Sequence, residues 1–210
     1  VLGLYTAPEG AHKGSKSAVI LAHGRGVHPS WGFIETLRRE LAEEGFHTLS
    51  LQMPILEETN KLADYARTFP EAYDRLDAGV TLLKRKGIAR IFLLGHSSGG
   101  MTVIAYEAER ANPAVSGVIA LGAGSDAAGG PRMQPPLMLE RIRNRPVLDI
   151  YGEKDLDIVL GSAPERAAAA QRAGNRAFKQ VRIAGADHFY TDHYEELRSQ
   201  LLAWLRPLAR

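Results

Sequence analysis

The sequence has no cysteine among its 210 residues. This absence excludes a disulfide scaffold, a thiolate nucleophile and a metal site built on cysteine ligands. It leaves the cellular compartment open, because a chain without cysteine folds equally well in a reducing cytoplasm and in an oxidising periplasm. No signal peptide is visible, and the start at Val1 fits a chain from which an export signal has been removed or left out.

Long apolar runs and a strong bias of charge are also lacking. No apolar stretch approaches the roughly 20 residues that a membrane-spanning helix requires, so we expect no stable membrane insertion. Lysine and arginine number 26 against 24 aspartate and glutamate residues, which gives a formal net charge of +2. These charges are mixed along the chain, and we therefore expect no nucleic-acid binding, which needs a clustered basic surface.

The overall composition is that of a globular protein. Hydrophobic residues make up 45% of the chain and charged residues 24%, close to the usual values for soluble proteins. A chain of this length can bury one apolar core, and no internal repeat or linker divides it. We therefore predict a single domain over residues 1–210.

Apolar, strand-like segments alternate with helix-like segments along the chain. The predicted strands are 1–6, 17–24, 47–53, 90–95, 115–123, 146–152 and 178–185. The predicted helices are 31–45, 62–67, 71–86, 98–111, 137–144, 163–173 and a last one that starts near Asp192, where Glu195 is placed to complete a capping box. This alternation predicts an α/β fold, a three-layer α/β/α sandwich around a mostly parallel sheet. Ligands of such sheets bind at the carboxyl ends of the strands.

The segment 95–99 reads GHSSG and lies between a predicted strand and a predicted helix. It has the form G-x-S-x-G, in which a sharp turn holds the serine in a strained backbone conformation with its hydroxyl clear of the sheet. The two glycines allow the strand and the helix to pack closely, and the helix start contributes backbone N–H groups. Ser97 is therefore the predicted nucleophile.

A serine hydroxyl is a weak nucleophile and needs a base. Of the seven histidines, His188 directly follows the last predicted strand, in the segment GADHFY. His193 is the nearest rival, but it lies at the start of the final helix, and His96 is expected to pack against the sheet. We predict that His188 is the general base.

The imidazole of such a base needs a carboxylate that holds its tautomer and stabilises its positive charge. Asp155 ends the segment YGEKD, just past the predicted strand 146–152, and it is our first choice. Asp157 lies two residues further on, and Asp126 follows the preceding strand, so both remain candidates. The order serine, aspartate, histidine is the order expected of α/β-hydrolases.

Four segments in this order carry a resemblance to the α/β-hydrolase superfamily over nearly the whole chain: HGRG (23–26), GHSSG (95–99), YGEKD (151–155) and GADHF (185–189). The string HGRGVHPSW further resembles a poorly characterised bacterial subgroup. The resemblance implies an oxyanion hole formed by the backbone N–H of Ser98 and that of Arg25, or of Gly26 if the loop is shifted.

The resemblance also sets an expectation for the substrate cleft. Many lipases of the superfamily insert a helical lid where this chain has only the segment 124–136, which is rich in Gly, Ala and Pro. We therefore expect a minimal lid or none, and an open cleft for small or medium acyl groups. The residues expected to border the substrate are Gly26, His28, Trp31 and Tyr65, whereas for Phe69 the sequence leaves a place in the cleft wall and a place in the core both open.

Together these features predict a serine hydrolase similar to carboxylesterases. It would cleave a small-molecule ester through an acyl-enzyme on Ser97 and would need neither a metal nor an organic cofactor. A thioesterase or small amidase with the same triad is one alternative. A non-catalytic scaffold that only binds its ligand is another, because a fold does not guarantee an activity.

Overall fold

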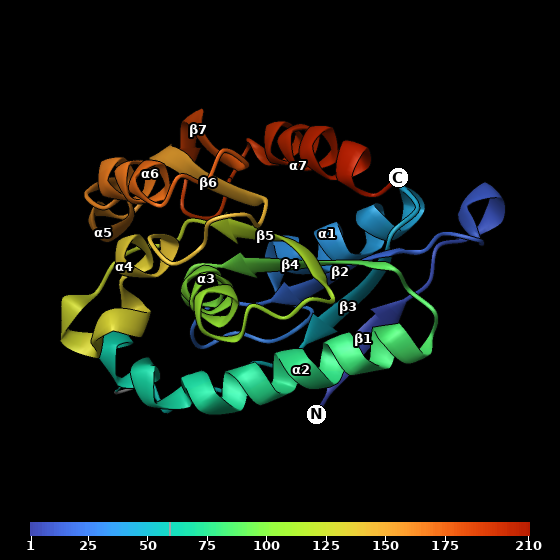
Figure 1. Cartoon of the computed structure of the whole chain (residues 1–210), viewed down its shortest axis with the longest axis horizontal. Helices are drawn as coiled ribbons and strands as arrows, with labels where there is room; N and C mark the ends of the chain where they lie inside the picture. The colour runs from blue at the N-terminus through green and yellow to red at the C-terminus, as the bar shows by residue number, and fades with distance from the viewer. Residues whose placement is uncertain (59) are drawn as a thin grey trace.

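The computed structural model describes residues 1–58 and 60–210 and has the three layers that the sequence predicts (Figure 1). Its central sheet has the strand order β1-β3-β2-β4-β5-β6-β7. The strands are β1 (Gly3–Thr6), β2 (Ser17–Ala22), β3 (His47–Leu51), β4 (Arg90–His96), β5 (Val115–Leu121), β6 (Val147–Lys154) and β7 (Phe178–Asp187). β1 pairs antiparallel with β3, and the other neighbouring strands are parallel.

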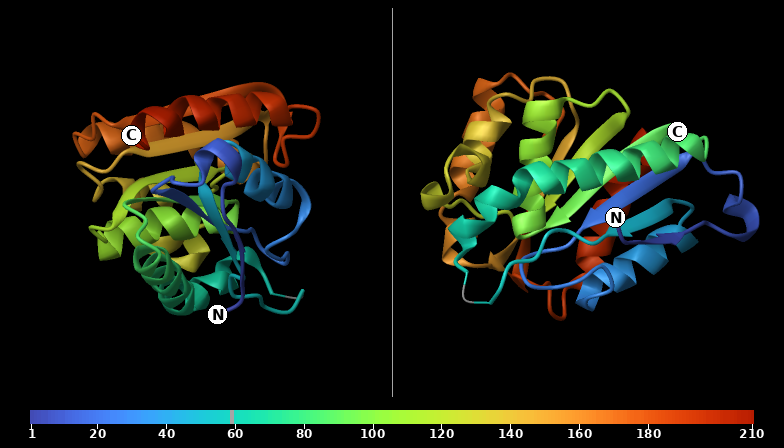
Figure 2. Two further views of the ribbon diagram at one scale, coloured as in Figure 1. Left: turned by 90° about the vertical axis from the view of Figure 1, so that its right-hand side faces the viewer. Right: turned by 90° about the horizontal axis from the view of Figure 1, so that it is seen from below.

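Helices cover both faces of this sheet, as the two further views show (Figure 2). They are α1 (Gly32–Glu43), α2 (Phe69–Arg85), α3 (Ser98–Arg110), α4 (Pro135–Leu139), α5 (Asp157–Leu160), α6 (Ala163–Arg172) and α7 (Tyr194–Leu208). α1 and α7 contribute to the apolar core on one face, and α2, α3 and α4 contribute to the core on the other face. A short 3₁₀ helix, Leu62–Thr68, forms at the predicted position.

Strand β2 shows why the sheet is enclosed. Its residues alternate between the two faces, so Ala18 and Ile20 belong to the core under α2 and α3, whereas Val19 and Leu21 belong to the core under α1 and α7. All four side chains are fully buried. A parallel strand buried on both faces needs apolar residues at every position, which explains the uninterrupted apolar sequence of this segment.

The last helix starts two residues after Asp192, but the capping box expected there is wrong. Helix α7 begins at Tyr194 with His193 as its N-cap residue, and no side chain caps it. Asp192, the expected N-cap residue, has a left-handed φ of 58°. The N–H of His193 bonds to the carbonyl of Tyr190, so a tight turn ends just before the helix and the capping box with Glu195 does not form.

The connection between β5 and β6 also differs from the expectation. It contains the 3₁₀ helices Ala127–Gly129 and Pro131–Met133, followed by α4. α4 starts at Pro135, earlier than predicted, because proline has no N–H to lose in the first turn of a helix. Among residues 1–58 and 60–210, no helix has the length and apolar character that crossing a bilayer requires.

A buried ion pair fixes the region between β6 and α6. The Arg166 Nε atom lies 2.8 Å from Asp149 Oδ2, and both side chains are fully buried. The Arg166 Nη1 atom also donates to the Val159 carbonyl at 3.0 Å and to Ser162 Oγ at 2.7 Å. Arg166 thereby ties the turn that follows β6 to the sheet.

Loss of this arginine should destabilise the fold strongly. Replacing Arg166 by Met leaves Asp149 buried without its cation, which should lower the free energy of unfolding by about 3–5 kcal/mol. Urea unfolding measures this change. The matched control is the double variant Arg166→Met with Asp149→Leu, which should recover most of the loss because no charge is then left unpaired. A single variant within about 1 kcal/mol of the parent would contradict this interpretation.

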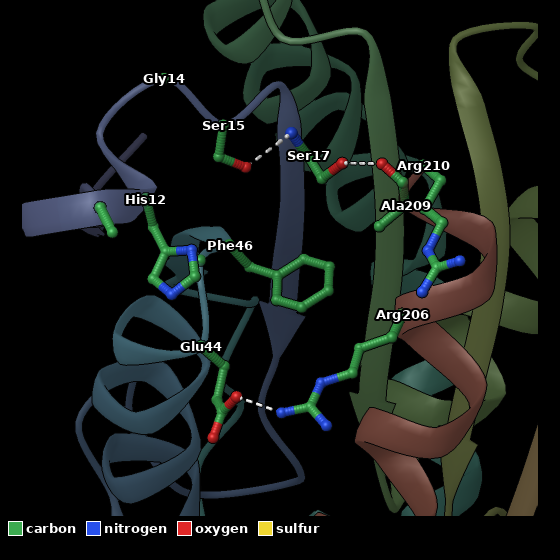
Figure 3. Close-up of a pocket in the computed structure, with 11 residues that line it drawn as sticks. His12, Gly14, Ser15, Ser17, Glu44, Phe46, Arg206, Ala209 and Arg210 are labelled. Carbon is green, nitrogen blue, oxygen red and sulfur yellow. Dashed lines mark hydrogen bonds and ion pairs between the residues drawn. The ribbon is translucent and has the colours of Figure 1, made fainter.

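A hollow of about 530 Å³ lies at the amino ends of β2 and β3 (Figure 3). His12, Phe46 and Arg206 line it, and Arg206 already pairs with Glu44 across the opening. Nearby, Ser17 Oγ donates to the Ala209 carbonyl at 2.9 Å, so the last residues lie beside the start of β2. This end of the sheet is opposite the one where parallel sheets bind ligands.

Candidate active site

Ser97 occupies the sharp turn between β4 and α3. Its φ of 56° and ψ of −121° place it in a region that residues with a side chain rarely adopt. The Ser97 N–H donates to the Leu121 carbonyl at the end of β5, 2.8 Å away. Such a strained position persists only when its surroundings hold it, and strained residues cluster at functional sites.

Two glycines allow this turn to form. A Cβ atom placed on Gly95 would lie 2.1 Å from the Gly99 carbonyl oxygen, and one placed on Gly99 would lie 2.3 Å from the Ala22 oxygen. Both distances are far below van der Waals contact. Any side chain at either position would therefore separate helix α3 from strands β2 and β4.

Asp155 and His188 form a buried hydrogen-bonded pair. The His188 Nδ1–H donates to Asp155 Oδ1 at 2.6 Å, and each residue is only 6% exposed. Asp155 also accepts the N–H of Leu156 at 2.8 Å and that of Gly152 at 3.2 Å. Because three donors surround the carboxyl group, its oxygens are held as acceptors and the histidine is held with its proton on Nδ1.

Contacts of the residues around Ser97 show that His188 lies near this turn. A Cβ atom on Gly122, which follows the β5 residue bonded to Ser97, would lie 3.0 Å from both His188 Cε1 and His188 Nδ1. The ring centroids of His188 and His96, the residue before Ser97, are 4.7 Å apart. The ends of β4, β5 and β7 therefore gather the serine and the imidazole at one edge of the sheet.

The other predicted acids do not contact His188. Asp157 is exposed and is the first residue of α5. Asp126 accepts the N–H of Ala128 at 3.0 Å and thereby caps a 3₁₀ turn. Of the three candidate carboxylates, the structure pairs Asp155 with the imidazole. The rival base His193 instead donates from Nδ1 to the Thr191 carbonyl at 2.8 Å.

A buried histidine shapes the loop after β2. The His23 Nε2 atom accepts the Met53 N–H at 2.9 Å, and its Nδ1–H donates to the Gly24 carbonyl at 2.8 Å. Burial lowers the pKa of His23, so the ring is neutral and holds these two bonds at once. A Cβ on Gly24 would lie 3.2 Å from Ser97 Cβ, which shows how closely this loop approaches the serine.

The expected oxyanion-hole residues flank the same turn. Ser98 is the first residue of α3, where a backbone N–H has no acceptor within the helix. Arg25 and Gly26 follow the loop residue that contacts Ser97, and both are exposed. The Arg25 Nη1 atom donates to the Asn60 carbonyl at 3.4 Å, so its side chain is directed to the segment after β3.

Of the expected substrate residues, Gly26 and Tyr65 line one cavity and the other two lie elsewhere. That cavity, of about 430 Å³, is bordered by Arg25, Gly26, Ile55 and Tyr65, among others. Tyr65 also lines a hollow of about 20 Å³ beside Ser98, large enough for one water molecule.

The remaining aromatic residues take different places. Trp31 packs edge-on against Phe189, with 5.4 Å between the ring centroids, and so borders the site from the His188 side. The His28 side chain is exposed and bonds to Ser30 at 3.2 Å, while its carbonyl accepts the N–H of Trp31 at 3.0 Å. Phe69 is 2% exposed and belongs to the core.

Sequence reasoning missed the apolar rim of the site. Leu156, Ile158 and Phe189 are 49%, 41% and 47% exposed, although large apolar side chains usually avoid solvent. Leu156 directly follows Asp155, and Phe189 directly follows His188. The position of Leu156 and Phe189 next to two predicted site residues was a signal in the sequence that could have revealed part of this rim.

Comparison with known proteins agrees with this architecture. The model of the alpha/beta hydrolase family matches residues 19–204. Phospholipase YtpA of Bacillus subtilis (strain 168) is 26% identical over 103 residues, which are 49% of this chain and 39% of that protein. The match therefore spans less than half of the length of that curated relative.

Solved structures resemble nearly the whole chain. Est1E from Butyrivibrio proteoclasticus, in a structure with ferulic acid bound, is 18% identical with a TM-score of 0.77, and the match covers 99% of this chain and 94% of that one. TT1662 from Thermus thermophilus is 21% identical with a TM-score of 0.74, and the match covers 99% and 93%. At such identities the likeness concerns the fold. Since the family model covers most of the sequence, this chain belongs to the alpha/beta hydrolase family.

Proposed function

We propose that the protein is a serine hydrolase that cleaves carboxylic esters with small to medium acyl groups. The observation that carries this proposal is the buried Asp155–His188 hydrogen bond at the sheet edge where Ser97 sits in its strained turn. A nucleophile, a base and an orienting acid in one row are the arrangement that acyl transfer to serine requires.

The reaction would proceed in two steps. The Ser97 oxygen attacks the ester carbonyl carbon while its proton passes to His188 Nε2, and Asp155 stabilises the imidazolium through the Nδ1–H bond. The backbone N–H groups of Ser98 and Arg25 would stabilise the negative charge on the carbonyl oxygen. His188 then protonates the departing alcohol, and a water molecule, deprotonated by the same histidine, releases the acid from Ser97.

The surroundings of the triad support a small or medium apolar group on the substrate. Leu156, Ile158 and Phe189 expose apolar surface beside the pair of acid and base, and Trp31 extends this surface. Removing such surface from water stabilises a bound apolar group by roughly 25 cal/mol per Å². A test panel should therefore include esters of straight-chain acids and of an aromatic acid such as ferulic acid, which a structural relative binds.

A fluorophosphonate probe tests the proposal. The native protein should be labelled, and mass spectrometry should place the adduct on the peptide that contains Ser97. Ser97→Ala should not be labelled, whereas the control Ser125→Ala, which changes a serine beyond the next strand, should react like the native protein. An unlabelled native protein, or equal labelling of Ser97→Ala, would contradict the proposal.

Assays of the same protein preparation with other substrates distinguish the rival activities. Thioesters and anilides offered beside the p-nitrophenyl esters show whether sulfur or nitrogen leaving groups are preferred. A protein that binds ligands equally well with and without Ser97 and turns over none of them would be a binding scaffold.

A further inference from the structure

His96, the residue before Ser97, has a bond that the proposed mechanism does not use. It ends strand β4 and is 2% exposed. Its Nε2 atom lies 2.9 Å from the main-chain oxygen of His188. Because a carbonyl oxygen can only accept, the Nε2 atom must carry the proton.

This bond joins the ends of two strands that are not neighbours in the sheet. His96 belongs to β4, and His188 directly follows β7, while β5 and β6 lie between these two strands. Strand β4, which leads to Ser97, and strand β7, which leads to His188, therefore share no backbone hydrogen bonds. The His96 side chain spans this gap and bonds to the backbone of His188 itself.

The ring of His96 is also held in a fixed orientation. It packs edge-on against Phe33, with 4.9 Å between centroids and an interplanar angle of 81°. On the other side it lies 4.7 Å from the His188 ring. These contacts leave the Nε2–H aimed at one acceptor, the His188 oxygen.

The protonation state of His96 suits this position. Burial and, to a smaller extent, the nearby His188 lower its pKa to about 4, so the ring is neutral at neutral pH. Its Nδ1 atom is buried and has no hydrogen-bond partner within the part of the chain that the structure describes. A buried polar atom without a partner is unfavourable, so packing alone does not explain a histidine here.

We propose that His96 is a positioning residue that holds the backbone of His188 against the strand that carries Ser97, and so keeps the imidazole in register with the nucleophile. This inference rests on the proposed serine hydrolase function. It assigns His96 no proton transfer, since its role is exerted through the hydrogen bond to the His188 main chain.

Three substitutions separate the hydrogen bond from the packing of the ring. Gln can place its amide nitrogen near the position of Nε2, Asn places it near the position of Nδ1, and Leu has no donor. His96→Leu and His96→Asn should lower kcat by about 10- to 100-fold with little change in KM, the size expected when one buried hydrogen bond is lost. His96→Gln should stay within about threefold of the native protein, because the donor is kept.

Two further measurements exclude a merely structural effect. The rate of fluorophosphonate labelling at Ser97 should follow the same order as kcat, because it reports how well the base serves the nucleophile. The Tm of each variant is measured beside it, and a purely structural role would make activity fall in step with Tm and not with the presence of the donor. If His96→Leu does not fold, the comparison of Gln with Asn decides.

The outcomes distinguish the two proposals. A native protein that is not labelled overturns the serine hydrolase function itself. A labelled native protein whose His96→Leu and His96→Asn variants react at the native rate overturns only the role of His96. A Gln variant as slow as the Leu variant likewise overturns the assigned hydrogen bond.

Discussion

Ser97→Ala is expected to lower kcat toward the best ester of the panel by about a million-fold. The hydroxyl is the only atom group that the change removes, and alanine can occupy the same strained turn with φ 56° about as well as serine. Substrate binding should persist, because the apolar rim and the oxyanion-hole N–H groups remain. The measurement is kcat with the purified variant, compared with native protein of equal circular dichroism.

The same loss should appear when the base is removed. His188→Ala is expected to be as slow as Ser97→Ala, and the double variant should be no slower than either single one, because residues that act as a unit are not additive. The control Ser125→Ala should keep native kcat. Independent, additive losses for Ser97 and His188 would mean that they do not act in one mechanism.

Asp155→Asn is expected to lower kcat by about 10⁴-fold. In the native protein, the Asp155 carboxylate accepts three N–H groups, from His188, Leu156 and Gly152. An amide of the same shape must turn its own N–H₂ toward one of these donors. The histidine is then no longer held with its proton on Nδ1, and the imidazolium loses its stabilising charge. The fold should be largely preserved, so the Tm should change far less than kcat.

Two matched aspartates serve as controls for this prediction. Asp157→Asn changes an exposed carboxylate two residues away, and Asp126→Asn changes one that caps a turn. Both should keep kcat within about threefold, as expected for surface substitutions. A large loss in either control, with Asp155→Asn nearly native, would move the role of the acid to that residue.

Much of this architecture can be predicted from the sequence because the relevant signals are local. The strands of a parallel sheet must be apolar on both faces, so segments such as 17–22 are recognisable by composition alone. A glycine-flanked serine between a strand and a helix predicts the sharp, strained turn that the serine occupies. The segments at the strand ends then follow one another in chain order, which favours His188 and Asp155, but Asp157 and Asp126 remain open as the acid until the structure pairs Asp155 with His188.

The remaining features depend on contacts between residues that are distant in the chain. Nothing near His96 in the sequence indicates that its ring reaches the backbone of His188, 92 residues away. The partner of Arg166 lies 17 residues earlier, in a strand that composition describes only as apolar. Local patterns also did not reveal that the capping box of α7 fails, because Asp192 has a left-handed φ and follows a tight turn closed by Tyr190 and His193.

The position of the C-terminal residues has a practical consequence. Since the Ala209 carbonyl bonds to Ser17 at the start of β2, the end of α7 is directed away from the edge of the sheet that carries Ser97. A resin or electrode coupled through an affinity tag after Arg210 would therefore leave the reactive serine open to dissolved molecules. Attachment through lysines would lack this advantage, because coupling at many different lysines orients the protein molecules at random.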